Sequence, residues 1–154
     1  LAAGPVPPYA VSMELLVAVL CDAAGDYGGT LNLIGVRDTL YARQFPVVHQ
    51  QCALALRFCL SSEDEGEHKL NIRLLNADGQ PVVPPIEPHI NIRLGAEVSF
   101  LTRNMIINLQ GLGFPQPGEY AIQIANGNRS LAEIPLRVVQ IASENPAEPA
   151  PPES

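Results

Sequence analysis

The chain has 154 residues, 47% of them hydrophobic, and carries 16 acidic against 9 basic residues, which gives a formal net charge of −7. This length fits one domain with a sizeable core. The negative charge disfavours phosphate backbones and anionic lipid surfaces, so we expect no nucleic-acid partner and no membrane partner. Fifteen prolines and twelve glycines separate short apolar runs, which favours many strands and turns over long helices.

The domain is expected to span residues 13–141. Residues 1–12 are predicted to be a flexible, Pro-rich arm, with Met13 as a candidate initiator. The apolar run that starts at Met13 could be mistaken for a signal peptide. No Lys or Arg precedes it, however, and Glu14 stands where a positive charge belongs. Residues 142–154 (ASENPAEPAPPES) have almost nothing to bury and are predicted to be a disordered tail.

The first half of the domain predicts three strands. Residues 13–22 are apolar on both faces, as in a central or covered strand. A glycine-rich loop is expected over 22–30, and a second strand over 31–39 with a bulge or close contact at Gly35. An irregular connection over 40–51 leads to a central strand over 51–60, in which apolar residues alternate regularly.

The second half begins with an acidic turn over 61–67, followed by a strand over 68–76. Four prolines keep the next segment extended, and a short strand follows near 90–94. The strand expected over 98–109 changes the parity of its apolar residues near 102–104, which predicts a bulge there.

Residues 114–139 predict a β-hairpin. Tyr120 and Ile122 lie in an alternating run, and the return strand repeats this pattern. Asn126-Gly127-Asn128 supplies residues that tolerate positive φ. We expect a three-residue loop, which sets Tyr120 opposite Ile134 and Ile122 opposite Ala132. A two-residue loop would turn the two apolar rows to opposite faces. The whole pattern predicts an all-β fold, an antiparallel sandwich of about seven to nine strands.

The corner of this hairpin, Pro117-Gly118-Glu119-Tyr120, resembles the tyrosine corner of immunoglobulin-like domains. Gly118 and Tyr120 match that pattern, whereas Gln116 stands where Asp is common. The segments MELLVAVLCDAA, LNLIGVRDTLYARQFP and NLQGLGFPQPGEY resemble a group of small bacterial proteins of unknown function, over residues 13–140. This resemblance implies an immunoglobulin-like sandwich and transfers no catalytic or ligand-binding residue.

The three cysteines are expected to be buried free thiols in a reducing cytoplasm. Cys52 and Cys59 lie on one predicted strand at an odd separation, so they face opposite sides and cannot bond to each other. The third is Cys21. Cys59 could act as a nucleophile beside His68 across a hairpin, but an inert thiol is the favoured interpretation.

We expect no cofactor and no metal. The histidines at 49, 68 and 89 form no HxH or HExxH pair. The acidic turn could hold calcium, but it lacks the ligand spacing of an EF-hand, and a solvated hairpin tip is favoured. No G-x-S-x-G elbow or phosphate loop is present. With no Trp and four Tyr, an aromatic platform for sugars is weakly supported.

One constellation suggests a function. If the strands over 51–60, 68–76 and 89–95 are neighbours, with Arg57 opposite Asn71, one sheet face opposite the core carries five polar residues: Arg57, Arg73, His89, Asn91 and Arg93. Such a face fits an acidic partner protein or a second subunit. The alternative is the ordinary hydrated face of a sheet.

We therefore expect a non-enzymatic binding or scaffold module that acts through protein contacts or self-association. The alternative is a small enzyme or a metal-dependent ligand binder with a site in its loops. A cleft that gathers His49 with Asp22 or Asp26 would indicate this alternative.

Overall fold

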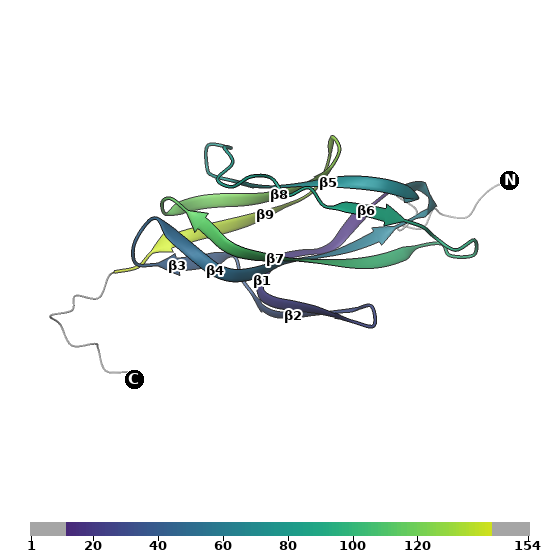
Figure 1. Ribbon diagram of the computed structural model, residues 1–154, viewed down its shortest axis with the longest axis horizontal. Helices are drawn as coiled ribbons and strands as arrows, with labels where there is room; N and C mark the ends of the chain where they lie inside the picture. The colour runs from purple at the N-terminus through teal and green to yellow at the C-terminus, as the bar shows by residue number, and fades with distance from the viewer. Residues whose placement is uncertain (1–11, 143–154) are drawn as a thin grey trace.

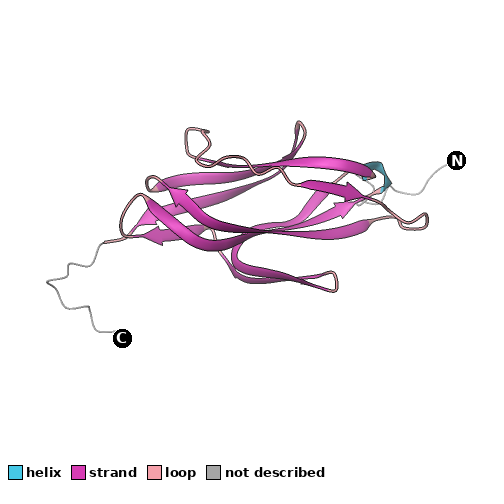
Figure 2. Ribbon diagram, viewed as in Figure 1, coloured by secondary structure: helices cyan, strands magenta, loops and turns pink. Residues whose placement is uncertain are grey.

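The computed structural model describes residues 12–142, and most of this part is β-strand (Figures 1 and 2). The predicted arm and tail, except for Ser12 and Ala142, lie outside the described residues. The strands are β1 (Glu14–Tyr27), β2 (Thr30–Val36), β3 (Thr39–Ala42), β4 (Val47–Leu60), β5 (Gly66–Leu75), β6 (His89–Ile92), β7 (Leu101–Phe114), β8 (Gly118–Asn126) and β9 (Arg129–Gln140). One short 3-10 turn, Ser62–Asp64, joins β4 to β5.

The nine strands form two sheets that face each other, with the orders β2-β1-β4-β7 and β3-β9-β8-β5-β6. The predicted all-β sandwich of about seven to nine strands is therefore confirmed. One pair departs from a purely antiparallel pattern, since β3 runs parallel to β9. β3 falls largely in the segment that was predicted to be irregular. Four residues are too few to show the alternating pattern of a strand. Among residues 12–142, no helix is long and apolar enough to cross a membrane.

The main core lies between the two sheets. The even-numbered residues of β4 from Cys52 to Leu60 are fully buried, and they pack in one cluster with Leu70 of β5 and Ile124 of β8. As predicted, β4 is a central strand, with β1 on one side and β7 on the other. Full burial of each large apolar side chain contributes about 1.5–3 kcal/mol relative to its exposure.

The predicted loop over 22–30 is instead part of a hairpin. The first half of β1 pairs with β4, and its second half, from Cys21 to Tyr27, pairs with β2. Gly28 and Gly29 form the two-residue turn with φ of +60° and +86°, which glycine adopts without steric cost. We call residues 22–36 the flap. Figure 1 shows it as a third layer on the outer side of the four-stranded sheet.

The predicted bulge near 102–104 is wrong. From Leu60 opposite Leu101 to Val47 opposite Phe114, β4 and β7 keep one register. The apolar residues that contact the core change from odd to even numbers further along, between Leu109 and Leu112. Gly111, with φ of +65°, lies at this change. A residue in the left-handed conformation can turn the side chains that follow it to the other face of the strand, which accounts for the change.

The β8–β9 hairpin also differs from the prediction of a three-residue loop. Tyr120 lies opposite Leu136, and the turn contains only two residues, Gly127 and Asn128. The register shifts next to this turn, which leaves Leu131 as an extra residue in β9. This bulge keeps both apolar rows on the core face, so a two-residue turn is compatible with the pattern.

The Tyr120 hydroxyl donates to the carbonyl oxygen of Gln116 at 2.5 Å. This is the bond that the resemblance to a tyrosine corner implies. The ring is 5% exposed and meets Phe114 edge-on, with ring centroids 5.0 Å apart and an interplanar angle of 76°. Gly118 has a φ of +150°. The corner therefore closes the turn between β7 and β8.

Candidate functional site

The structure divides four of the five predicted site residues between the two sheets, and the fifth, Arg93, follows the end of β6. Arg57 lies on β4 in the four-stranded sheet, whereas Arg73 on β5 and both His89 and Asn91 on β6 lie in the five-stranded sheet. The prediction of one shared face is therefore wrong, and so is the pairing of Arg57 with Asn71. Arg57 pairs with Val17 and Asn104, and Arg73 pairs with Gln123.

The reason lies in the acidic turn, which carries the chain across the sandwich instead of making a hairpin. Asp64 is 3% exposed, and both of its carboxylate oxygens lie 2.9 Å from the Met13 nitrogen. It also accepts from the Ser61 backbone at 2.9 Å. The expectation of a solvated tip fails for Asp64, whose oxygens are already engaged by N–H donors. The spacing Ser61-x-x-Asp64 is a capping pattern that could have indicated this turn.

His68 supports the same turn. Its Nε2 lies 2.6 Å from the Asp64 carbonyl oxygen, and its Nδ1 lies 3.1 Å from the Asn126 side-chain nitrogen. The nitrogen of the Asn126 amide can only donate and the Asp64 carbonyl oxygen can only accept, so a ring with its proton on Nε2 satisfies both contacts. Both nitrogens are engaged, so His68 is not placed as a base for Cys59.

Arg57 is held within its own chain. Its Nη1 donates to the carbonyl oxygen of Gly29 at 3.0 Å and to the side chain of Asn104 at 2.7 Å. Its Nη2 donates to Thr102 at 3.1 Å. Arg57 therefore connects the tip of the flap to β4 and β7, and we remove it from the predicted interface.

The other four predicted residues lie on or beside the outer face of the five-stranded sheet. Arg73, His89, Asn91 and Arg93 are all exposed. His89 pairs with Lys69, and Asn91 with Glu67. His89 and Asn91 are therefore four and six positions along β5 from Arg73, so the predicted residues do not gather at one point on this face.

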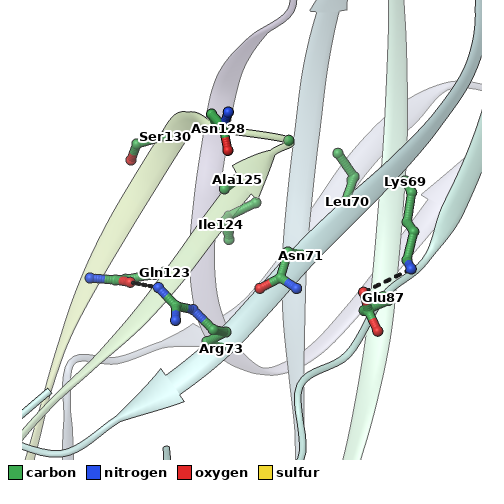
Figure 3. A pocket seen from close by; sticks show the side chains of 11 residues that line it. Lys69, Leu70, Asn71, Arg73, Glu87, Gln123, Ile124, Ala125, Asn128 and Ser130 are labelled. Carbon is green, nitrogen blue, oxygen red and sulfur yellow. Dashed lines mark hydrogen bonds and ion pairs between the residues drawn. The ribbon is translucent and has the colours of Figure 1, made fainter. Parts of the chain in front are cut away.

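A hollow of about 620 Å³ opens on this face (Figure 3). Arg73 donates to the Gln123 side-chain oxygen at 2.9 Å, and the Lys69 ammonium lies 3.1 Å from Glu87. In Figure 3, Asn71 lies between these two pairs. The remaining lining comes from β8, from the β8–β9 turn with Gly127 and Asn128, from Ser130 at the start of β9, and from Leu70 of β5.

Gln123 extends this contact across three strands. Its nitrogen donates to Glu133 of β9 at 3.0 Å, while its oxygen accepts from Arg73 of β5. The sequence did not indicate Gln123 because the pairing of β5 with β8 joins residues about fifty positions apart.

The three cysteines are free and buried, as predicted. Burial raises the pKa of each thiol above its ordinary value. Neighbouring acidic groups raise it further, with Asp22 acting on Cys21 and Glu14 acting on Cys59. A raised pKa lowers the fraction of thiolate at neutral pH, which is the reactive form.

Asp22 and Asp26, which were considered for a site in the loops, each bind a different partner within the chain. The Arg37 guanidinium lies 2.8 Å from both Asp22 oxygens. This hydrogen bond holds the pKa of Asp22 below its usual value, and His49 lowers it further. Asp26 accepts from the Gly29 backbone at 2.9 Å in the turn of the flap. In the part of the chain that the structure describes, no group of three or more His, Cys, Asp or Glu residues is arranged to hold a metal ion.

Comparisons with known proteins give a family and a fold. A family model described as a "Family of unknown function (DUF6941)" matches residues 16–139. No curated protein matches the sequence. A mutant beta-glucosidase from Listeria innocua in complex with laminaribiose is similar in structure, with a TM-score of 0.50 and 7% identity over 86% of this chain. The chain spans 16% of that enzyme.

Two further solved structures are similar at lower scores. The beta-glucosidase from Listeria innocua in complex with isofagomine has a TM-score of 0.48 and 9% identity over 70% of this chain and 15% of its own. An immunoglobulin-like protein from Pseudomonas aeruginosa has a TM-score of 0.41 and 17% identity, over 84% of this chain and 98% of its own. At these identities the likeness concerns the fold alone.

Proposed function

This chain belongs to the DUF6941 family, whose function is unknown, and we propose that it is a non-enzymatic binding module that acts through protein contacts. The binding surface is the outer face of the five-stranded sheet, centred on the hollow beside Arg73. One observation carries this proposal. The hollow has a basic side chain at each of two ends, on a chain whose net charge is −7.

The chemistry of the hollow favours an extended acidic segment of a partner protein. Lys69 and Arg73 lie four residues apart on β5, which places their Cα atoms about 13 Å apart on the same face. An extended peptide that carries carboxylates four positions apart has the same spacing. Asn71 and Asn128 add amide groups that can bond to its backbone.

The charges predict a weak and salt-sensitive complex. Lys69 is paired with Glu87, and Arg73 is bonded to Gln123, so a partner carboxylate has to share these donors. Exposed ion pairs contribute about 0–1 kcal/mol each. Charge complementarity of this kind acts mainly on the rate of association and its dependence on salt.

We include a reducing cytoplasm in the proposal. The three free cysteines support this location, because an oxidising compartment favours chains whose cysteines form disulfides.

A synthetic peptide tests the proposal. Its sequence is extended, with Glu at every fourth position, and a matched peptide carries Gln at those positions. Fluorescence anisotropy should show binding of the Glu peptide that weakens steeply with added salt, and weaker binding of the Gln peptide. Arg73→Gln should reduce the affinity up to about fivefold, the equivalent of about 1 kcal/mol.

Arg137→Gln is the control, because Arg137 is an exposed cation on β9 of the same sheet and does not line the hollow. It removes the same charge and should change the affinity little. Equal binding of the two peptides, or an equal effect of the two substitutions, would contradict the proposed site.

A further inference from the structure

The outermost strand of the flap, β2, forms one end of the four-stranded sheet. Within the described residues it pairs only with β1. Its sequence, TLNLIGV, contains no charged residue. Edge strands of natural proteins usually carry charges, prolines or bulges that prevent pairing with another chain. A seven-residue edge without charge in an acidic chain is therefore available for such pairing.

The geometry of the hairpin indicates which backbone groups are free. In a two-residue hairpin the residues that flank the turn, Tyr27 and Thr30, form a hydrogen-bonded pair. Hydrogen-bonded and non-hydrogen-bonded pairs alternate from there. The N–H and C=O groups of Leu31 and Leu33 consequently point away from β1, toward the open edge.

We propose that two copies of this chain pair antiparallel through their β2 edges, about a two-fold axis at Leu33. In this arrangement Leu33 faces its counterpart in a hydrogen-bonded pair. Asn32 of one copy lies opposite Ile34 of the other, and Thr30 lies opposite Val36. No charged residue of β2 meets another, so the strand is complementary to itself even though each chain carries a net charge of −7.

The exposed side chains of the flap fit the same partner. Ile34 is 67% exposed and Val36 is 56% exposed. Antiparallel pairing places these apolar groups beside the Thr30 methyl group and the Asn32 side chain of the second copy. Cross-strand neighbours of this kind stabilise sheets.

The flap is also ordered before it pairs. Arg57 and Asn104 both donate to Gly29 at its tip, and Arg37 bonds to Asp22 at its base. Apart from Gly35, whose φ is +69°, the strand is already held in its extended form and loses little conformational entropy on association. The other edges differ: β3 and β6 have four residues each, and β7 carries Arg103, which donates to the Asn91 carbonyl oxygen at 2.9 Å.

This inference is independent of the proposed peptide site, because the flap and the hollow lie on different sheets of the sandwich. A dimer formed through β2 leaves the hollow free on both copies.

Cysteine substitutions test the register directly. Asn32→Cys and Ile34→Cys proteins are prepared separately, mixed, and oxidised mildly. In the proposed pairing these two positions face each other as a non-hydrogen-bonded pair, with Cα atoms about 4.5 Å apart, which is within the range of a disulfide. The native cysteines are buried. The mixture should form cross-linked dimers faster than either protein alone, since identical positions lie on opposite sides of the axis.

Sedimentation velocity of the wild-type chain should show a mass that rises from monomer to dimer with concentration. Ile34→Lys should shift this equilibrium toward monomer at least tenfold. Val48→Lys is the control, since Val48 is a comparably exposed apolar residue on β4. A wild-type chain that stays monomeric at all concentrations overturns the proposal. So does a mixture that cross-links no faster than the separate proteins.

Discussion

The guanidinium of Arg57 donates to the carbonyl oxygen of Gly29 over 3.0 Å, which joins the centre of β4 to the tip of the flap. Asn104 donates to the same oxygen at 3.1 Å. Beneath the flap lies a second, smaller core that contains Cys21, Ala53 and Ala55. Small side chains on the outer face of β4 allow the flap to pack closely, so the sandwich gains a third layer over part of one sheet.

Substitution of Arg57 should loosen the flap without unfolding the sandwich. Arg57→Gln removes the charged donor from Gly29 and Asn104, and hydrogen bonds to charged groups contribute about 1.5–3 kcal/mol each. Hydrogen–deuterium exchange should become faster across residues 22–36 and stay slow in β8 and β9. Arg73→Gln, on the other sheet, is the control. Equal exchange in the flap of both variants would show that Arg57 does not hold it.

Gly35 should be essential to the base of the flap. It has a φ of +69°, and a Cβ at this position would lie 2.2 Å from an Asp22 carboxylate oxygen. Gly35→Ala therefore adds backbone strain and displaces Asp22 from Arg37. Gly79→Ala is the matched control, because Gly79 has a φ of +78° with nothing within 4 Å of its Cβ.

The control should lower the free energy of unfolding by about 1 kcal/mol, the cost of a left-handed residue. Gly35→Ala should lower it by about 2–4 kcal/mol, since the strain and the displaced ion pair add. Denaturant unfolding measures both. Equal stability of the two variants would contradict this prediction and would mean that Asp22 moves aside without cost.

The tyrosine corner should contribute to stability through its hydroxyl group. Tyr120→Phe removes the bond to Gln116 and leaves that carbonyl oxygen unpaired, which costs about 1–3 kcal/mol. Tyr120→Ala also opens a cavity, and the loss should reach about 3–5 kcal/mol. Tyr27→Phe serves as the control, since Tyr27 is 72% exposed. A Tyr120→Phe protein as stable as wild type would remove the corner from this account.

The thiols should be unreactive at neutral pH, and they should affect the stability of the fold only under alkaline conditions. Burial raises the folded-state pKa of each cysteine above its ordinary value. Stability linked to a raised pKa is fully present below the unfolded value and is lost as the pH rises through the folded value. Ionisation of the buried thiols should therefore lower the melting temperature above about pH 9. A variant with all three cysteines replaced by alanine should show a smaller fall of the melting temperature over the same pH range.

Reducing agent and chelator should leave the melting temperature unchanged. No disulfide joins the cysteines, and removal of a structural disulfide or metal would otherwise cost several kcal/mol. A large drop with either reagent, measured by circular dichroism, would be inconsistent with the structure.

Local patterns in the sequence predicted much of the fold. The alternation in residues 51–60 and 68–76 indicated two strands, and Gly118 with Tyr120 indicated the corner. The second strand of the flap was predicted, but the extension of β1 to Tyr27 was missed because two adjacent glycines suggest a loop as readily as a turn. The β8–β9 register was misjudged because a bulge at Leu131 restores the parity that a two-residue turn would otherwise break.

The candidate site was harder to predict because it depends on pairings between distant residues. Arg57 and Arg73 were placed on neighbouring strands since their strands follow each other in the chain. The buried Asp64 instead fixes a turn that sends them to different sheets. Nothing local to Arg73 indicates that Gln123 lies beside it, because the two are joined only by the pairing of β5 with β8.

Chemical-shift mapping on the isotope-labelled chain locates the surface to which the acidic peptide binds. The Glu peptide is titrated into the protein at low and at moderate salt, and the backbone amide signals are followed. We expect shifts in residues 69–73 and 123–130, around the hollow, that diminish as salt is added. Shifts that gather on the flap, or that persist unchanged at higher salt, would contradict binding at the outer face of the five-stranded sheet.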